Sequence, residues 1–173
     1  RGGFNTLILG TQKIGQIHFL FDGKAVQLQS FFEEKKQILI DSTSSLTANM
    51  RQRGGGILDI QLKDKSNLIK DYYQLHLTFD TVDSMGANFI NSCLEQIAKT
   101  LQSLALDHKA FLNDQNTIEV IMSILSNYVP QCLVQAEVRC AVGALEDSAG
   151  MSGKQFAQKF IQALEIAQKE PYR

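Results

Sequence analysis

The segment DSMGAN, residues 83–88, joins two stretches of different periodicity. The preceding LHLTFDTV alternates apolar and polar residues as a strand does, and the following FINSCLEQIAKTLQSL repeats apolar residues every three or four positions as a helix does. A helix start offers free backbone N–H groups and the positive end of the helix dipole, and a glycine there lets a ligand approach the backbone. The segment therefore has the chemistry of a phosphate or pyrophosphate site.

The residue types of this segment allow two interpretations. In the first, Asp83 or Asn88 hydrogen-bonds a ribose or amide of a ligand whose phosphates lie at Gly86. In the second, Asp83 or Ser84 only caps the helix and Met85 packs beneath it. Spacing alone favours capping.

Composition restricts the class of protein. The 173 residues suffice for one ordinary domain, or for a small domain plus part of another. A formal net charge of −1 argues against a dedicated binder of nucleic acid or anionic membranes, and no apolar run approaches the roughly 20 residues that span a bilayer. The three cysteines lack metal-ligand spacing and no signal-peptide pattern occurs, so we expect no metal site and buried thiols in a reducing cytoplasm.

Periodicity predicts six elements in the order strand, helix, strand, strand, helix, strand. The predicted strands are residues 16–21, 58–62, 73–81 and 118–124, and the predicted helices are residues 26–40 and 87–104. This order is that of the ferredoxin-like split βαβ arrangement, an α+β fold with an antiparallel sheet covered by helices on one face. It is not a Rossmann series, and no G-x-G-x-x-G occurs.

The same periodicity assigns buried faces. It groups Leu58 with Ile60 and Leu62, and it groups Met122 and Ile124 with Ile118. It also places Val26 on the buried face of its helix. The polar, glycine-rich stretch between the first helix and the second strand predicts a turn.

A further strand and helix follow the sixth element. Residues 133–142 alternate as a strand does, and Ser152 with Gln155 forms a capping box that starts a helix. The buried face of this helix is predicted to carry Phe156, Phe160, Leu164 and Ala167. The pair exceeds a six-element domain, so we expect it to belong to a larger domain.

Five short motifs resemble, in order and spacing, the bacterial (class II) 3-hydroxy-3-methylglutaryl-coenzyme A (HMG-CoA) reductases. They are RGGF (1–4), RGGGILDI (53–60), DSMGAN with FINSCLE, ILSN (124–127) and PYR (171–173). The resemblance covers essentially the whole chain and implies a fragment of a longer protein. Residues 11–126 would be the small NAD(P)-binding domain, and residues 1–10 and 127–173 would be segments of the large domain that surrounds it.

The resemblance also implies site residues. The cofactor would be bound by Asp83, Ser84, Met85, Gly86, Ala87 and Asn88, with its pyrophosphate at Gly86, Ala87 and the helix start. Asn127 would help to hold the hydroxymethylglutaryl group, and Arg173 would pair with its carboxylate. The alternatives are a turn asparagine and a solvated arginine.

Cofactor preference is implied by a departure from the family pattern. Family members that use NADH carry an aspartate near Thr47 for the adenosine ribose, whereas here Thr47 and Asn49 are followed by Arg51 and Arg53. Without the acid, nothing repels a 2′-phosphate and an arginine could pair with it, so we expect NADPH rather than NADH. The alternative is that these arginines lie on a solvated helix end.

The family reduces HMG-CoA to mevalonate and coenzyme A by two hydride transfers from NAD(P)H. The glutamate, lysine, aspartate and histidine that it uses fall outside these 173 residues, so we expect no catalytic residue and no activity in this chain alone. His18 and His76 lie in predicted strands and His108 in a polar loop, and none is assigned to catalysis. The full-length protein is expected to be a cytoplasmic homodimer or higher oligomer.

Two other classes of function are compatible with this fold. A ferredoxin-like domain can serve as a non-catalytic ligand-binding or regulatory module, because fold does not fix function. A single-strand nucleic-acid binder would need exposed aromatics on its central strands and a basic face, and ILDIQL supplies neither. A catalytic lysine soon after Arg173 in the parent gene would distinguish the reductase from the regulatory module.

Overall fold

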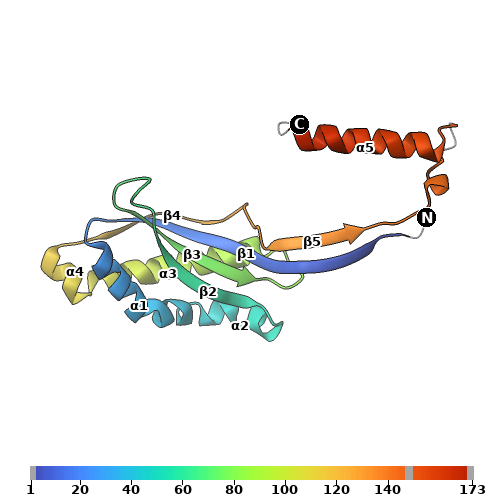
Figure 1. Ribbon diagram of the computed structural model, residues 1–173. Helices are drawn as coiled ribbons and strands as arrows, with labels where there is room; N and C mark the ends of the chain where they lie inside the picture. The colour runs from blue at the N-terminus through green and yellow to red at the C-terminus, as the bar shows by residue number, and fades with distance from the viewer. Residues whose placement is uncertain (1–2, 147–149, 171–173) are drawn as a thin grey trace. The chain divides into compact units, whose positions relative to one another are not determined.

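The computed structural model describes residues 3–146 and 150–170 (Figure 1). The chain divides into two compact units. The larger is Leu9–Leu133, and the smaller combines Arg1–Ile8 with Val134–Arg173. The segment predicted as the small domain, residues 11–126, lies within the larger unit.

The sheet of the structure is antiparallel. Its strands are β1 (Asn5–Phe21), β2 (Gly56–Asp64), β3 (Tyr72–Asp80), β4 (Ile118–Leu125) and β5 (Cys132–Glu137). The order is β2-β3-β1-β4, with β5 also pairing with β1, and the β1–β3, β1–β4 and β2–β3 ladders all run antiparallel. The predicted α+β fold is therefore confirmed, although β1 begins well before the predicted residue 16.

The helices of the larger unit cover one face of this sheet (Figure 1). They are α1 (Ala25–Asp41), α2 (Ser44–Gln52), α3 (Ala87–Leu106) and α4 (Lys109–Asp114). The core lies between the two layers, where the period-two rows of β1 and β3 meet the apolar face of α3. Its fully buried residues include Ile17, Phe19, Phe21, Leu75, Leu77, Phe79, Ile90, Cys93, Leu94 and Ile97.

A bulge in β2 changes the face on which one predicted core residue lies. The β2–β3 register shifts between Ile57 and Asp59, so Leu58 is the extra residue of its strand. A bulge moves neighbouring side chains to the opposite face. Leu58 is accordingly 51% exposed whereas Ile60 is fully buried, and the prediction that they share a face was wrong.

A second bulge acts in the same way on β4. The β1–β4 register shifts between His18 and Phe19, where Met122 and Val120 are the successive partners. Ile118 before the shift is buried, but Met122 and Ile124 beyond it are exposed. Their predicted common face with Ile118 was wrong for the same reason as in β2.

Helix α1 buries a face different from the predicted one at its start. Leu28, Phe31 and Leu39 are buried, whereas Val26 is exposed. Residues two apart on a helix point about 200° away from each other, so Val26 cannot share a face with Leu28. The prediction for Val26 was wrong.

Helices α2 and α4 were not predicted, because each buries very few side chains. α2 is held to the core by the buried side chains of Thr47 and Met50, just after buried Thr43. α4 is held by Phe111, whose ring lies 4.9 Å from that of Phe21 and 4.8 Å from that of Phe31, centroid to centroid. One or two buried side chains per helix are too few to give a periodic signal.

In the smaller unit the predicted capping box is confirmed. A short 3₁₀ helix, Val142–Leu145, precedes α5 (Gly153–Lys169), so the predicted strand over 133–142 already ends at Glu137. Ser152 Oγ accepts a hydrogen bond from the Gln155 N–H at 3.4 Å. On the face predicted to be buried, Phe156, Phe160 and Leu164 are exposed among the described residues, so burial of this face against a larger domain stays a prediction. An apolar stripe predicts which face of a helix can be buried, but that face is buried only where another element packs against it.

The cysteines are unpaired. Burial raises the pKa of the Cys93 thiol to about 11. Cys140 follows the end of β5 and is exposed, so the prediction of buried thiols is confirmed for Cys93 and wrong for Cys140. None of the described helices combines the length and the apolar character that a membrane-spanning helix requires.

The bulge in β2 gives a direct stability test. Ile60→Ala should lower the free energy of unfolding by about 2–5 kcal/mol, because it leaves a cavity in the core. Leu58→Ala, its control two residues away, should change it by no more than about 0.5 kcal/mol. Urea unfolding followed by circular dichroism measures both, and equal losses would contradict the bulged register.

His18 and His76 predict a dependence of stability on pH. Both lie on the sheet face opposite the helices. Burial lowers the pKa of both imidazoles, and Lys63 and Lys65 add to the effect at His76. The unfolded chain therefore binds protons more readily, so this stability is complete above pH about 6.5 and is lost as the pH falls through the lower folded-state pKa values.

We expect the melting temperature to fall between pH 7 and pH 5. The His18→Gln/His76→Gln variant should show about half that fall or less, because glutamine does not titrate. Thermal melts at half-unit pH intervals measure the difference. An unchanged fall in the double variant would assign the effect to other groups.

Candidate functional site

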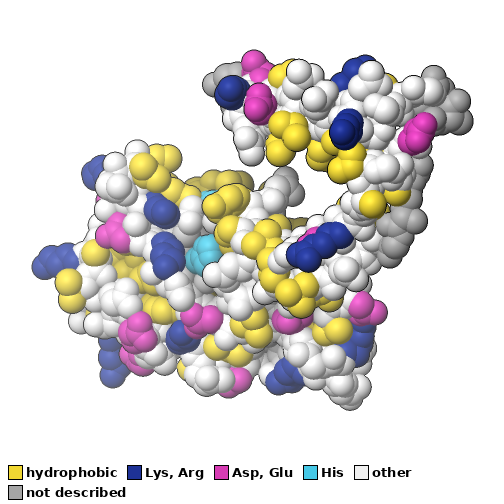
Figure 2. All heavy atoms as spheres, turned by 45° about the vertical axis from the view of Figure 1, so that its right-hand side comes forward, with side chains coloured by type: hydrophobic (Ala, Val, Ile, Leu, Met, Phe, Trp, Pro, Cys, Tyr) yellow, Lys and Arg dark blue, Asp and Glu magenta, His cyan; other side chains and the backbone are white. Residues whose placement is uncertain are grey.

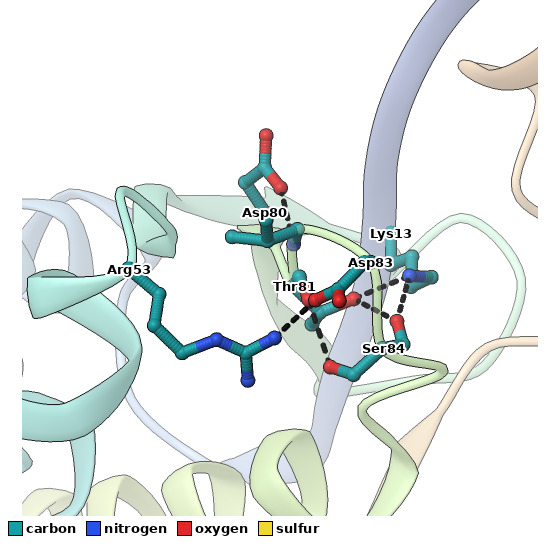
Figure 3. A network of polar contacts seen from close by, with 7 residues as sticks. Lys13, Arg53, Asp80, Thr81, Asp83 and Ser84 are labelled. Atoms are coloured by element: carbon teal, nitrogen blue, oxygen red, sulfur yellow. Dashed lines mark hydrogen bonds and ion pairs between the residues drawn. The ribbon is translucent and has the colours of Figure 1, made fainter.

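The segment DSMGAN connects the end of β3 to the start of α3 and lies beside the end of α2 (Figure 3). Asp80 is the last residue of β3, and Gly86 is the N-cap of α3. Arg53 follows α2 directly, and Lys13 reaches the segment from β1. Residues distant in the sequence thus converge at one helix start.

Gly86 has a backbone conformation that favours glycine. Its φ is 76° and its ψ is 10°, in the left-handed region. A Cβ added there would lie 2.4 Å from Thr81 Cγ2, so no side chain fits without displacement. The first α-helical bond of α3 runs from the Ile90 N–H to the Gly86 carbonyl at 2.9 Å. The N–H groups of residues 87–89 precede it and have no carbonyl four residues back within the helix.

The turn before Gly86 is held by side-chain hydrogen bonds. Thr81 is fully buried, and its hydroxyl donates to the Ser84 carbonyl at 2.7 Å. The Ser84 hydroxyl donates back to the Thr81 carbonyl at 2.8 Å. Lys13 Nζ donates to the same Ser84 carbonyl at 2.8 Å and also to Thr81 Oγ1. The start of α3 is therefore fixed to β1 through this turn (Figure 3).

Val82, inside the turn, has a strained backbone. Its φ is 54°, which is rare for a β-branched residue. The Val82 N–H donates to Asp80 Oδ1 at 2.7 Å, and Asp80 Oδ2 accepts from the Thr11 hydroxyl at 2.8 Å. Such strain, of order 1–3 kcal/mol, persists only where the surroundings over-determine the conformation.

The glycines of RGGG pack directly against the end of β3. A Cβ on Gly55 would lie 2.5 Å from the Asp80 carbonyl oxygen, and Gly54 and Gly56 have φ of 90° and 129°. This close packing brings the Arg53 guanidinium to the Asp83 carboxylate, with which it forms an ion pair. The two side chains are 49% and 79% exposed, so the pair contributes little to stability and can exchange partners.

The capping interpretation of DSMGAN is wrong. No side chain caps α3, because Asp83 pairs with Arg53 and the Ser84 hydroxyl donates to a carbonyl. Met85 does not pack beneath the helix but is 75% exposed. Asn88 is also exposed, in the first turn of α3. The side chains of Asp83, Met85 and Asn88 are therefore on the surface, where a ligand can reach them.

Thr47 and Asn49 point in different directions on α2. Thr47 is only 4% exposed, and its hydroxyl donates to the Thr43 carbonyl at 3.0 Å. Asn49 is exposed. Arg51 donates to the Ser44 carbonyl at 3.1 Å, along its own helix. Of this group, Asn49, Arg51 and Arg53 are exposed, and Arg53 reaches the turn through its ion pair with Asp83.

Asn127 lies in the exposed loop after β4, at the same end of the sheet as the turn. The Ser126 N–H donates to the Ile14 carbonyl at 2.8 Å, next to Lys13 on β1. The Leu125 N–H donates to Asn91 Oδ1 at 3.0 Å, in the second turn of α3. Arg173 lies outside the described residues, so its predicted role stays a prediction.

A hollow of about 600 Å³ lies on the sheet face opposite the helices. Its lining includes Gln16, Gln61, His76, Tyr128 and Gln131. Figure 2 shows histidine side chains among hydrophobic ones on one face of the molecule. In residues 3–146 and 150–170 no cluster of three or more His, Cys, Asp or Glu side chains could hold a metal ion.

Comparison with known proteins identifies relatives along the whole chain. A family model described as hydroxymethylglutaryl-coenzyme A reductase matches residues 1–173. The 3-hydroxy-3-methylglutaryl-coenzyme A reductase of Archaeoglobus fulgidus is 24% identical over 174 residues, which cover 99% of this chain and 36% of that protein. The chain thus spans little more than a third of this curated relative.

Solved structures give the same family. The 3-hydroxy-3-methylglutaryl-coenzyme A reductase of Streptococcus pneumoniae aligns with a TM-score of 0.71 at 30% identity, over 98% of this chain and 37% of that one. A structure of the class II enzyme from the same organism, bound to NADPH in open conformations, aligns with a TM-score of 0.69 at 29% identity. That alignment covers 98% of this chain and 42% of the other.

The contact between Gly86 and Thr81 can be tested by stability measurements. Gly86→Ala should lower the free energy of unfolding by more than Gly54→Ala. Both residues have positive φ, which costs roughly 1 kcal/mol for alanine, but only Gly86 meets a buried side chain. Thr81→Ser removes the nearest atom, Cγ2, and keeps the hydroxyl, so it should restore part of the loss.

Urea unfolding of the four single and double variants measures this coupling. The Gly86→Ala and Thr81→Ser effects should be non-additive by about 0.5–3 kcal/mol, as expected for residues in contact. Additive effects, or equal losses for the two glycine variants, would contradict the close approach at Gly86.

Proposed function

Because this chain belongs to the hydroxymethylglutaryl-coenzyme A reductase family, we propose that it supplies the cofactor-binding part of such a reductase. The parent protein would interconvert HMG-CoA with mevalonate and coenzyme A by two hydride transfers from NAD(P)H. One observation carries the proposal: the Thr81–Ser84 turn holds the start of the 20-residue helix α3 at the surface beside the Arg53–Asp83 pair.

The start of α3 suits the pyrophosphate of a dinucleotide. Its first N–H groups lack helical acceptors, and the helix dipole adds a positive potential there. Gly86 carries no side chain that would keep a phosphate from the backbone. Asn88 can donate from its amide, and Asp83 can accept from a ribose hydroxyl. Ser84, Met85 and Ala87 would complete the contact surface, with Ser84 mainly shaping the turn through its carbonyl.

We propose that NADPH is the preferred cofactor, with NADH as the alternative. An adenosine 2′-phosphate could replace the Asp83 carboxylate as the partner of Arg53, because that ion pair is exposed. Asn49 would lie beside it as a hydrogen-bonding group. Thr47 would not contact the cofactor. Its buried hydroxyl adds no negative charge at the surface, so it would not repel the 2′-phosphate. An aspartate at Thr47 would be buried, so its effect would mix folding with cofactor choice.

The remaining roles concern parts of the parent protein. We propose that residues 11–126 form its small domain, that residues 1–10 and 127–173 belong to the large domain, and that Asn127 and Arg173 contact the hydroxymethylglutaryl group. The catalytic acid–base residues would lie in the rest of the parent, which would act as a homodimer or higher oligomer. The unpaired cysteines suit a reducing cytoplasm.

Binding measurements on the full-length parent test the cofactor proposal. Asn88→Ala should raise the Kd for NADPH and for NADH alike, by about five- to tenfold, because it removes one hydrogen bond. Arg53→Gln should raise the Kd for NADPH by about 10- to 100-fold and that for NADH by no more than about twofold, because only NADPH carries the 2′-phosphate.

Isothermal titration with each cofactor gives these constants. Lys99→Gln, which removes the same charge from an exposed position of α3, is the control and should change neither. In Arg53→Gln the Asp83 carboxylate is left unpaired and could itself repel a phosphate. The Arg53→Gln/Asp83→Asn variant removes both charges, so it shows how much of the change in Kd is due to loss of the arginine alone. Equal weakening of NADPH and NADH by Arg53→Gln would contradict recognition of the 2′-phosphate.

A further inference from the structure

Lys13 occupies a core-facing position of β1. Gly15, Ile17, Phe19 and Phe21 follow it at two-residue spacing, and all are buried. Across the ladder Lys13 pairs with Phe79, which is fully buried. Lys13 therefore continues an apolar row with an ammonium group, and its side chain is half-buried rather than solvated.

The ammonium of Lys13 lies within the Thr81–Ser84 turn. Nζ donates to the Ser84 carbonyl at 2.8 Å and to Thr81 Oγ1, and these two residues are the ends of the turn that contains the strained Val82 (Figure 3). Lys13 forms no ion pair within 4.0 Å with any described residue. Its positive charge thus meets only neutral oxygens there, whereas Arg53 on the outer side is paired with Asp83.

We propose that Lys13 is a positioning residue of the cofactor site. Its ammonium fixes the Thr81–Ser84 turn, and through the turn it fixes Gly86 and the first N–H groups of α3. Its unneutralised charge also adds to the positive potential at the helix start, where the pyrophosphate would bind. The inference rests on the proposed function and extends it to a residue on a different strand.

Two variants separate positioning from a merely structural role. Lys13→Met keeps the length of the aliphatic side chain and removes the ammonium, and Lys13→Arg keeps a positive donor. In the full-length parent, Lys13→Met should raise the Kd for both NADPH and NADH by at least about tenfold, with the KM for the acyl-coenzyme A substrate within about twofold. Lys13→Arg should recover most of that loss.

Hydrogen exchange gives a readout that does not need cofactor. In the ligand-free protein, Lys13→Met should speed exchange of the Ser84 N–H, which donates to the Thr81 carbonyl at 3.0 Å, by at least about tenfold. The Gly55 N–H, which donates to the Met50 carbonyl at 3.0 Å, is the matched control and should be unchanged.

The outcomes distinguish this inference from the proposed function. Suppose that the unmodified parent binds NADPH and that Asn88→Ala weakens this binding. If Lys13→Met then changes neither the Kd for cofactor nor the exchange rate of the Ser84 N–H, the positioning role of Lys13 is overturned and the proposed function stands. A lower melting temperature for Lys13→Met with an unaltered Kd would likewise overturn it. If the unmodified parent binds no nicotinamide cofactor, the proposed function fails first.

Discussion

The hydrogen bonds between Thr81 and Ser84 determine where helix α3 begins, and the candidate site is built on that starting point. Each residue's hydroxyl bonds the other's carbonyl, so the chain turns sharply after β3. The turn forces Val82 to a positive φ and leaves Gly86 against Thr81. Because the apolar face of α3 is buried on the sheet, the helix cannot slide to relieve this strain.

Charge is distributed unevenly around this turn. On its inner side Lys13 bonds neutral oxygens, and on its outer side Arg53 pairs with the exposed Asp83. A half-buried cation is screened less by solvent than an exposed ion pair, which exchanges partners readily. The arrangement suits a ligand with two anionic groups, one bound by the backbone N–H groups of the helix start and one that competes with Asp83 for the exposed Arg53 guanidinium.

Sequence periodicity predicted the elements whose buried rows are uninterrupted. The row from Ile17 to Phe21 and the apolar face of α3 are of this kind. It failed at Leu58 and Met122 because a bulge adds one residue to a strand, and a pattern of period two carries no sign of it. Followed backwards from Phe21 to Gly15 at two-residue spacing, the same row leads to Lys13. The sequence alone could therefore have predicted that Lys13 lies on the core-facing side of the strand. No local pattern pairs Arg53 with Asp83, because that contact depends on how closely RGGG packs on β3.

Apolar surface on each unit indicates where further protein would be in contact. On the larger unit, Met122, Ile124 and Tyr128 are exposed on or beside the sheet face opposite the helices, and on the smaller unit Phe160 and Leu164 are exposed on one face of α5. Apolar groups gathered in this way mark interaction surfaces more often than free ones. Asn127, proposed to contact substrate, lies beside the first of these surfaces, whereas the exposed residues near the start of α3 are the polar Asp83 and Asn88 together with Met85. Under the proposed function, protein that covers the first of these surfaces would lie beside Asn127, whereas the cofactor would be bound at the start of α3.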